Sequence, residues 1–572
     1  MGQLQTPHTT NPLPHSLLLL IWCILGLSLR LVNLAADPPW TDECATLVFS
    51  LGNSFRTVPV DRLIGSDLLL QPLQPRPDAG VADVWQYLMG ESTHPPAYFM
   101  LAHGWMSLWM KLFPPENGLV SLWSARSLPA LLGTAAIPAI FGCCYLTVRD
   151  RTLAQLAAAL MAVSPFAIYL AREARHYTLV ILLIIASLSC LVKAARAISD
   201  GKSFPLWLSL VWIATNTLGI ATHYFFALTL CSQLCVLLGF SIPRWRSHLP
   251  QPAWKNIILA ILGTSAGSFV WIPIWQEIRQ SNLTGWVYDG SVGIVEPLGR
   301  SIAWLSSTLA LLPSYPAIVP LPVVIVLGLV AIGFLGWFAR LFYRGLRRQM
   351  SAPETRFSIQ VFGGVVVASW VVMLGLTYGN GSDLTLAPRF GFIYFPAWVI
   401  LVATCLGACL QLGSSPMDFL KKNSSIALVG FAGILGSLTV ISNVSYLQTH
   451  RSDLMADLIE RTSNVPVLIT TTHKHHGDTG RMMGLAWEFR QNPQSEWGQP
   501  PQFLLAHKTE GSPDATSAAI ALQQAVSQLP RPVDVWAIDF HAPIELDALG
   551  CDRDRSLKKN LGDYRYKLYH CH

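Results

Sequence analysis

Long apolar runs recur along this chain and constrain its fold more than any other feature. A helix needs about 20 apolar residues, at ~1.5 Å each, to cross the hydrocarbon core of a bilayer. The runs are Leu17–Leu34, Ser127–Val148, Thr152–Leu170, Tyr177–Ala195, Pro205–Thr222, Tyr224–Phe240, Ile257–Trp275, Pro316–Phe338, Phe357–Thr377, Phe390–Leu412 and Ser425–Ile441. They predict a polytopic α-helical membrane protein with about 11 spans.

The composition supports this fold class and excludes others. Hydrophobic residues make up 52% of the 572 residues and charged residues only 13%, whereas a soluble domain carries about 25% charged residues. The net charge of +6 is small, and the basic residues lie in short loops between apolar runs, so nucleic acid is not an expected partner. The first run lacks a charged segment before it and a small-residue cleavage site, which indicates a retained span and not a signal peptide.

The loop charges predict the orientation in the membrane. The basic clusters are Arg149/Arg151, Lys193/Arg196/Lys202, Arg244/Arg246/Lys255, Arg340/Arg344/Arg347/Arg348 and Lys421/Lys422. All of them fall on the cytoplasmic side if the helix that follows His94 only dips into the membrane from outside. We therefore expect a multi-pass protein of the inner or plasma membrane, with a cytoplasmic N-terminus and an extracytoplasmic C-terminus.

The last 130 residues differ from the rest because they are polar. Their expected elements are strands at Val465–Thr471, Gln502–His507 and Pro532–Phe540 and a helix at Ala515–Gln528. We predict two domains, a membrane module over residues 1–442, with residues 35–96 as an outer loop, and a small α/β extracytoplasmic domain over residues 443–572. Cys551 and Cys571 are the only cysteine pair in this tail, and we expect them to form a disulfide in an oxidising compartment.

Two adjacent carboxylates, Asp42 and Glu43, follow directly on the first apolar run. Carboxylates at a membrane boundary are expensive unless they are solvated, paired or used. They could be a solvated loop pair, or they could include a general base at a membrane cleft. The predicted topology places further polar stretches on the same outer face, which favours a site: Arg172–Tyr177, His223-Tyr224, Gln276–Arg300 and Tyr378–Arg389.

A series of motifs over the first ~230 residues resembles a known family of membrane enzymes. The motifs are Trp40–Glu43, His94–Phe99, Arg126–Gly133, Ser164–Phe166, Glu173–Tyr177 and Thr222–Phe225, with Pro388-Arg389-Phe390 later in the chain. Their order is similar to that of GT-C glycosyltransferases of the family 39 type, the protein mannosyltransferase and ArnT-like enzymes. The C-terminal domain is not covered. Ala45 stands where ArnT-type members carry an arginine, which argues against specificity for aminoarabinose.

This resemblance implies transfer of a sugar from a polyprenyl-phosphate donor to a lipid, glycan or protein acceptor, with inversion and with membrane lipids as surroundings. Asp42 would be the general base, and Glu43 would hold a partner cation. Arg175, Arg389 and Arg126 would bind the donor phosphate, because a guanidinium fork matches its oxygens. The further expected substrate-binding residues are His94, Glu173, Tyr177, His223 and Tyr224. Monophosphate donors in this family need no catalytic metal, so none is expected, nor any other cofactor.

Simpler interpretations of the same residues remain open. Glu173 and Arg175 could form a surface ion pair, and Arg389 could be a boundary arginine whose charge reaches the interface. His94 and His223 could be interfacial or hydrogen-bonded core histidines. For the whole protein, the alternatives are a transporter or flippase of lipid-linked or small polar substrates, and a non-catalytic envelope-assembly subunit. The lack of inverted repeats argues against a transporter.

Overall fold

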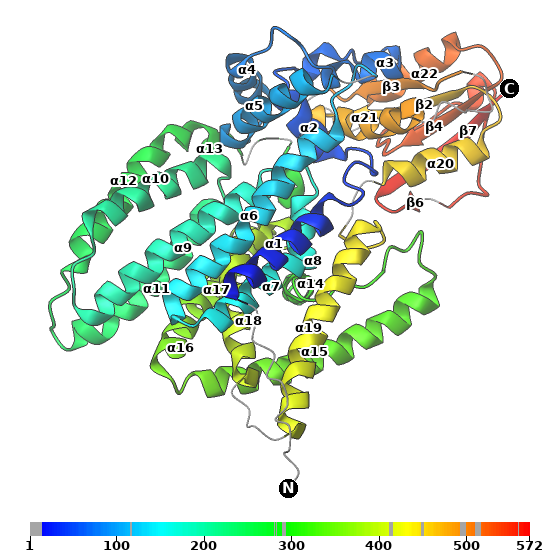
Figure 1. The fold of residues 1–572 in the computed structure, drawn as a ribbon. Helices are drawn as coiled ribbons and strands as arrows, with labels where there is room; N and C mark the ends of the chain where they lie inside the picture. Colours follow the sequence, from blue (N-terminus) through cyan, green and yellow to red (C-terminus); the bar gives the residue numbers. More distant parts are fainter. Residues whose placement is uncertain are drawn as a thin grey trace.

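A computed structural model shows a bundle of helices with a mixed sheet at one end (Figure 1). It describes residues 14–114, 117–278, 281, 283–288, 293–410, 416–447, 451–491, 499–509, 516–558 and 560–572. The predicted fold class, a helical membrane protein with a small C-terminal α/β region, is confirmed.

The bundle is built from the predicted apolar runs. Its helices are α1 (His15–Leu31), α6 (Leu122–Val148), α7 (Arg151–Val163), α8 (Pro165–Ala171), α9 (Tyr177–Asp200), α10 (Leu206–Thr222), α11 (Phe226–Arg246), α12 (Ala253–Ser268), α13 (Ile272–Ile278), α14 (Glu296–Ser307), α15 (Leu321–Gln349), α16 (Pro353–Ser358), α17 (Gly364–Asn380), α18 (Phe395–Leu410) and α19 (Pro416–Ile441). By length and composition, 7 helical segments of the described chain could cross a membrane, or 8 if the bent pair α7–α8 is one span. The shorter apolar helices α1, α10 and α18 coincide with the remaining predicted runs, and the number of spans stays a prediction.

The chain between α1 and α6 stays at the sheet end of the bundle. It contains α2 (Thr41–Ser50), β1 (Leu63–Gly65), α3 (Ser66–Leu69), α4 (Val81–Glu91) and α5 (Ala97–Leu112). Arg126, in the second turn of α6, donates a hydrogen bond to the carbonyl of Leu34 just after α1, at 3.0 Å. The end of α1 and the start of α6 are therefore adjacent, and α5, the helix that follows His94, does not carry the chain to the opposite end.

The C-terminal part forms most of the sheet. Its elements are α20 (Ser452–Thr462), β2 (Val467–His473), α21 (His476–Gln491), β3 (Gln502–His507), α22 (Thr516–Gln528), β4 (Val533–Ile538), β5 (Cys551–Arg553), β6 (Asn560–Leu561) and β7 (Tyr564–Cys571). The predicted strands correspond to β2, β3 and β4, and the predicted helix to α22; residue 515, its expected start, lies outside the described residues. Strands β5 to β7 were not predicted: β5 and β6 have only 3 and 2 residues, whereas the alternating pattern of β7 is a strand signal that the sequence prediction missed.

The strand order is β1-β3-β2-β4-β7-β5, with β6 paired to β7. Strands β3, β2 and β4 are parallel and largely buried on both faces, as central strands covered by helices should be. One face packs against α22 and the other against α2 and α21. The edge strand β1 comes from the loop after α1 and pairs antiparallel with β3. The loop that carries the acid pair thus shares a sheet with the C-terminal domain.

A buried arginine supports the bend between α7 and α8. Helix α7 ends before Pro165, and the two helices meet at 54°. Proline cannot continue the hydrogen-bond ladder, so the last carbonyls of α7 need other partners. Arg30 of α1, which is fully buried, donates to the carbonyls of Met161 and Ala162 at 3.1 and 3.2 Å. The negative end of the α7 dipole stabilises this charge.

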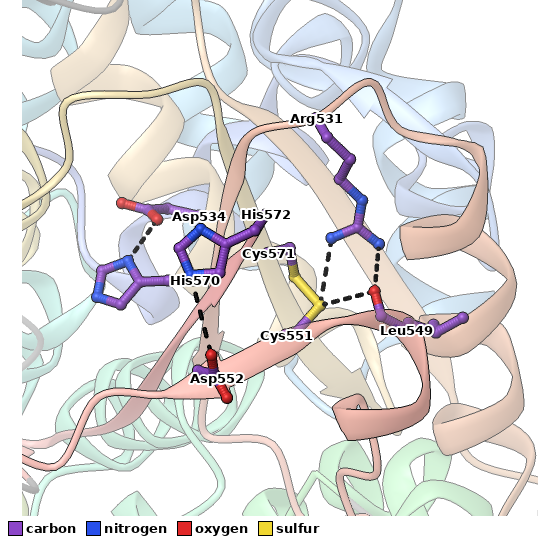
Figure 2. Close-up of a disulfide and its surroundings, with 8 residues drawn as sticks. All are labelled: Arg531, Asp534, Leu549, Cys551, Asp552, His570, Cys571 and His572. Carbon is purple, nitrogen blue, oxygen red and sulfur yellow. Dashed lines mark hydrogen bonds and ion pairs between the residues drawn. A yellow bond between two sulfur atoms is a disulfide. The ribbon is translucent and has the colours of Figure 1, made fainter.

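Cys551 and Cys571 are joined by a disulfide, as expected, with an S–S distance of 2.01 Å. The bond links β5 to the end of β7 (Figure 2). Beside it, His570 Nδ1 lies 2.7 Å from the buried carboxylate of Asp534. Its Nε2 lies 3.6 Å from Asp554.

This histidine should make the stability of the C-terminal domain depend on pH. Burial lowers the pKa of His570, but the hydrogen bond and charge of Asp534, with those of Asp554, raise it above its usual value. Its ion pairs therefore stabilise the fold fully below about pH 6.5 and are lost as the pH rises through the raised pKa. We expect His570→Gln to lower the unfolding free energy by about 1 kcal/mol at pH 6 and by much less at pH 8.5.

Thermal unfolding of the purified full-length protein at the two pH values measures this difference. His572→Gln is the matched control, because His572 is 74% exposed and lies 3.9 Å from an exposed carboxylate. An equal loss of stability at both pH values for His570→Gln would contradict the prediction.

Candidate functional site

The acid pair occupies the first turn of α2, at the sheet end of the bundle. Carboxylates are favourable there because the first turn presents the positive end of the helix dipole. Pro38, Pro39 and Trp40 precede the helix in extended conformation and bring the chain from α1 into α2. The two carboxylates then take different surroundings.

Glu43 forms a buried, two-pronged ion pair with Arg126. Arg126 Nε and Nη2 donate to the Glu43 carboxylate at 2.8 and 2.7 Å, and the backbone N–H of Ala174 donates to it at 2.7 Å. The other donors of Arg126 bind the carbonyls of Leu34, Asp37 and Pro38. All five N–H donors of the guanidinium are thus used. Glu43 therefore pairs with a cation, and this cation is Arg126. Because every donor of Arg126 is used in this arrangement, the structure gives no support to the prediction that Arg126 binds the donor phosphate.

Asp42 is the accessible carboxylate of the pair, with a side chain 30% exposed against 1% for Glu43. Its Oδ2 lies 3.2 Å from Arg389 Nη2 and 3.8 Å from Arg175 Nη2. Two residues that the sequence analysis placed at a phosphate site, one from the connection between α8 and α9 and one from the segment before α18, therefore meet at Asp42.

Arg175 is held firmly by the acid motif. Its side chain is 2% exposed, and Nη1 donates to the carbonyl of Asp42 and to Thr46 Oγ1, both at 2.8 Å. Nη2 lies 3.1 Å from His94 Nε2, and His94 Nδ1 lies 3.1 Å from Ser92 Oγ. Burial, reinforced by the charge of Arg175, lowers the pKa of His94 well below its usual value. A neutral His94 that donates from Nδ1 and accepts at Nε2 fits both contacts.

Arg389 is the second residue of the short 3₁₀ segment η6 (Pro388–Ile393) and has three aromatic rings around it. Its guanidinium carbon is 5.2 Å from the ring centre of Trp40, 5.7 Å from that of Trp286 and 5.8 Å from that of Phe390. The side chain is 13% exposed, and rings at these distances attract a desolvated cation. This burial contradicts the interpretation of Arg389 as a boundary residue that reaches for the interface.

Three histidines gather next to Arg175. The ring centres of His176 and His223 are 4.7 Å apart and those of His94 and His176 are 5.7 Å apart. The guanidinium carbon of Arg175 lies 5.8 Å from the ring centre of Tyr177. His176 is fully buried, and neither ring nitrogen has a hydrogen-bond partner among the described residues. The sequence analysis missed His176 as a site residue, although its place between Arg175 and Tyr177 was a usable signal.

Tyr224 differs from the other expected substrate-binding residues. Its ring packs against Trp271 and Trp275, with both centroid distances at 6.0 Å. Within the described part of the chain it has no hydrogen bond or ring contact with the arginines and histidines around Asp42. We therefore leave Tyr224 out of the site.

Glu173 lies behind the ion pairs, in a pocket that it lines together with Trp40, Glu43 and Tyr169. Its Oε2 is buried without a hydrogen-bond partner among the described residues. Burial first, and then the charge of Glu43, raise the pKa of Glu173 to about 8, so the carboxyl is mostly protonated at neutral pH. The alternative of a surface ion pair between Glu173 and Arg175 is contradicted, because Arg175 is buried and pairs with Asp42.

The C-terminal domain also contacts the acid motif directly. A Cβ at Gly480 of α21 would lie 3.1 Å from the carbonyl of Thr41, and one at Gly484 would lie 2.9 Å from that of Pro39. These glycines let α21 pack against the backbone that carries Asp42. The short connection after His473 leads from β2 into α21, and the ring centre of His476, the first residue of α21, lies 4.9 Å from that of Phe55. The sequence analysis missed this contact, for which the spacing of the two glycines was the only signal.

No family model matches the sequence, and no curated protein matches it. Several solved structures are similar in fold. ArnT from Cupriavidus metallidurans bound to undecaprenyl phosphate has 13% identity and a TM-score of 0.47, with 97% of each chain covered. The apo oligosaccharyltransferase of Archaeoglobus fulgidus has 11% identity and a TM-score of 0.42, with 92% of this chain and 69% of that chain covered.

The Pmt1-Pmt2 protein O-mannosyltransferase complex of S. cerevisiae bound to the sugar donor has 16% identity and a TM-score of 0.32, with 48% of this chain and 34% of that chain covered. An ArnT and a protein mannosyltransferase are also the two kinds of enzyme named in the sequence resemblance. Likenesses at this level assign no site residue to the chain.

Proposed function

We propose that the protein is a membrane glycosyltransferase that moves a sugar from a polyprenyl-phosphate donor to an acceptor hydroxyl, with inversion and with Asp42 as the general base. The membrane module, residues 1–442, carries the reacting groups, and the domain over residues 443–572 packs on them. The observation that carries the proposal is the meeting of one partly exposed carboxylate with two buried guanidinium groups at the end of a membrane bundle.

The charge balance of the site supports an anionic ligand. Glu43 and Arg126 neutralise each other, and Glu173 is mostly protonated at neutral pH. Arg175 and Arg389 then face the single charge of Asp42, which leaves an excess of one positive charge in a buried place. A phosphate matches two guanidinium groups in charge and in geometry, and the bundle around it can hold a prenyl chain.

Binding of the donor would also prepare the base. Asp42 Oδ2 lies 3.2 Å from Arg389 Nη2. A donor phosphate competes for that guanidinium, because it offers more charge and more acceptor oxygens. Once Arg389 turns to the phosphate, the carboxylate of Asp42 loses one cationic neighbour and accepts a proton more readily. The base would therefore become stronger when the donor is present.

The transfer itself is one displacement. The acceptor hydroxyl gives its proton to Asp42 while its oxygen attacks the anomeric carbon from the face opposite the phosphate. The bond between that carbon and the phosphate oxygen breaks, and the electron pair leaves with polyprenyl phosphate. Negative charge grows on the phosphate as the bond breaks, so Arg389 and Arg175 stabilise the transition state more than the bound donor.

The position of the basic loops supports an extracytoplasmic site. At the end of the bundle away from the sheet, Arg196 pairs with Glu354 at 2.8 Å, and Arg244 donates to the carbonyl of Ser199 at 3.2 Å. Loops from α9, α11 and α16 thus meet at a basic end, which the positive-inside rule assigns to the cytoplasm. The acid motif lies at the other end, where a lipid, glycan or protein acceptor of the cell envelope could reach it.

Turnover of a labelled polyprenyl-phosphate sugar by the purified protein tests the proposal. With a membrane extract as the source of acceptors, we expect label to appear in an acceptor and polyprenyl phosphate to be released in equal amount. A transporter or an assembly subunit would release neither product.

Asp42→Asn should abolish transfer while the protein still folds and binds donor. The amide keeps the shape of the carboxylate but cannot accept a proton, and loss of the base lowers the rate about 10²- to 10⁴-fold. Initial rates of transfer measure the effect. Asp457→Asn, at an exposed ion pair of α20, is the control and should keep the parent rate. Activity of Asp42→Asn within a few-fold of the parent would remove Asp42 from the mechanism.

Arg389→Lys should lower kcat and kcat/KM together, by about 10-fold or more, and change donor affinity much less. Lysine keeps the charge but loses the planar pair of donors that follows the phosphate as it gains charge. Steady-state kinetics and donor titration separate the two effects, and thermal unfolding checks the fold. Arg461→Lys, at the partner of Asp457, serves as the control. Parent-like kinetics for Arg389→Lys would leave Arg175 as the phosphate ligand.

Glu173→Gln should change the pH profile more than the rate at neutral pH. As the pH rises through about 8, Glu173 ionises and its new charge competes with the phosphate for Arg389 and Arg175. We expect kcat/KM of the parent to fall above about pH 8 and that of Glu173→Gln, which stays uncharged, to fall less. Profiles from pH 6 to 9.5 measure this. Identical profiles would show that Glu173 does not titrate beside the donor.

A further inference from the structure

A hollow at the edge of the C-terminal sheet gathers positive charge away from Asp42. It lies between the connection from β5 to β6 and the middle of β7. Its walls carry the cationic side chains Arg553, Arg555, Lys558 and Lys567, and its remaining lining is Asp554, Leu557, Tyr566 and Leu568. Tyr566 and Leu568 are largely buried and belong to the apolar layer between the sheet and α2.

The four cations of this hollow have no carboxylate partner within 4 Å among the described residues. Asp554, the one acid in the lining, is already used, because it accepts from the backbone N–H of Ser556 at 2.7 Å and lies 3.6 Å from His570 Nε2. Four arginines elsewhere in the same domain are paired, namely Arg451 with Asp453, Arg461 with Asp457, Arg481 with Asp539 and Arg490 with Asp67, whereas Arg531 and Arg565 have no ion pair among the described residues. Four unpaired cations around one concavity repel one another unless an anion joins them.

The scaffold holds the backbone that carries these cations. The disulfide between Cys551 and Cys571 fixes the start of the β5–β6 connection to β7 (Figure 2). The backbone N–H of Asp554 donates to the carbonyl of Leu568 at 3.0 Å, and β6 pairs with β7 where the connection ends. The side chains of Arg553, Arg555 and Lys558 are exposed and therefore open to a ligand from solution or from the membrane surface. A backbone that is organised in advance loses less entropy when the site binds.

The strand that forms one wall of the hollow follows a turn that contacts the chain before α15. Figure 1 shows β6 on the side of the domain that faces α19 and the chain before α15. At the β6–β7 turn, Gly562 fits closely against the hydroxyl of Tyr315, where a Cβ would clash. Tyr315 precedes by a few residues the start of α15, a long apolar helix whose surface is mostly exposed. Lys567 is five residues beyond Gly562, or about 17 Å at most along an extended strand.

We propose that this hollow binds a phosphate group at the membrane surface, carried as a phosphomonoester or phosphodiester on a lipid headgroup. The chemistry is the same as for free phosphate: charge-assisted hydrogen bonds from arginine and lysine to phosphate oxygens. The place next to the helix ends favours the lipid as its source. The site is independent of the reaction at Asp42 and stands whether or not the protein transfers sugar.

Calorimetric titration of the purified full-length protein in detergent tests the site. The probes are inorganic phosphate, a short-chain phosphatidic acid and a sugar-headed lipid of equal chain length that carries no phosphate. The variant is Lys558→Gln/Lys567→Gln, and the matched control is Lys474→Gln/Lys508→Gln, which removes the same charge from the same domain. Each titration is repeated in Arg389→Gln, so that binding at the proposed donor site is separated from binding at the hollow.

We expect phosphatidic acid to bind the parent and Arg389→Gln alike, and the sugar-headed lipid to bind neither. Loss of two cations should weaken that binding about 10- to 30-fold, while the control stays within 2-fold of the parent. Tighter binding of phosphatidic acid than of inorganic phosphate identifies the lipid as the source, and equal affinities identify free phosphate. Failure of both phosphate probes to bind, or equal weakening in variant and control, would overturn the proposal. Thermal unfolding of each variant confirms that it is folded.

Discussion

The buried ion pair between Glu43 and Arg126 is the interaction on which the rest of the site depends. Two charges in the protein interior are tolerated only when their remaining hydrogen-bonding groups are satisfied. Here the guanidinium uses every donor, and the carboxylate also accepts from the connection between α8 and α9. One contact therefore joins the end of α1, the start of α2, α6 and that connection. Removal of either partner would leave a buried charge, at a cost of about 3–5 kcal/mol.

In this arrangement the two adjacent acids, Glu43 and Asp42, have different roles. Glu43 is buried and forms the structural ion pair with Arg126, while Asp42 is partly exposed and faces Arg175 and Arg389. The ion pair between Glu43 and Arg126 positions the start of α2, so that Asp42 lies near two cations. The single negative charge of Asp42 cannot neutralise both of them. In our proposal the donor phosphate completes the charge balance and takes Arg389 from the base. The C-terminal domain also supports the acid motif, because Gly480 and Gly484 of α21 pack closely against the backbone of that motif.

Much of this arrangement could be predicted from the sequence, because membrane spans and motifs leave local signals. The apolar runs predicted the helices of the bundle. The position of Asp42 and Glu43 directly after the first run predicted that these two acids lie at one end of the bundle. The sequence could not show which of three arginines Glu43 would pair with, because that choice depends on the packing of α6 against α1. The role of Arg30 was hidden for a similar reason, since its partners are carbonyls of another helix. Strand β1 was missed because three residues carry no period, and its partner β3 lies more than 400 residues away.

The most direct test of the account is a cryo-EM structure of the protein with a bound polyprenyl phosphate. The account predicts phosphate oxygens within hydrogen-bond distance of Arg389 and Arg175, and a separation between Asp42 and Arg389 longer than the 3.2 Å of the ligand-free structure. A phosphate bound elsewhere, with Arg389 still on Asp42, would contradict the claim that these two arginines form the donor site and that donor binding releases the base.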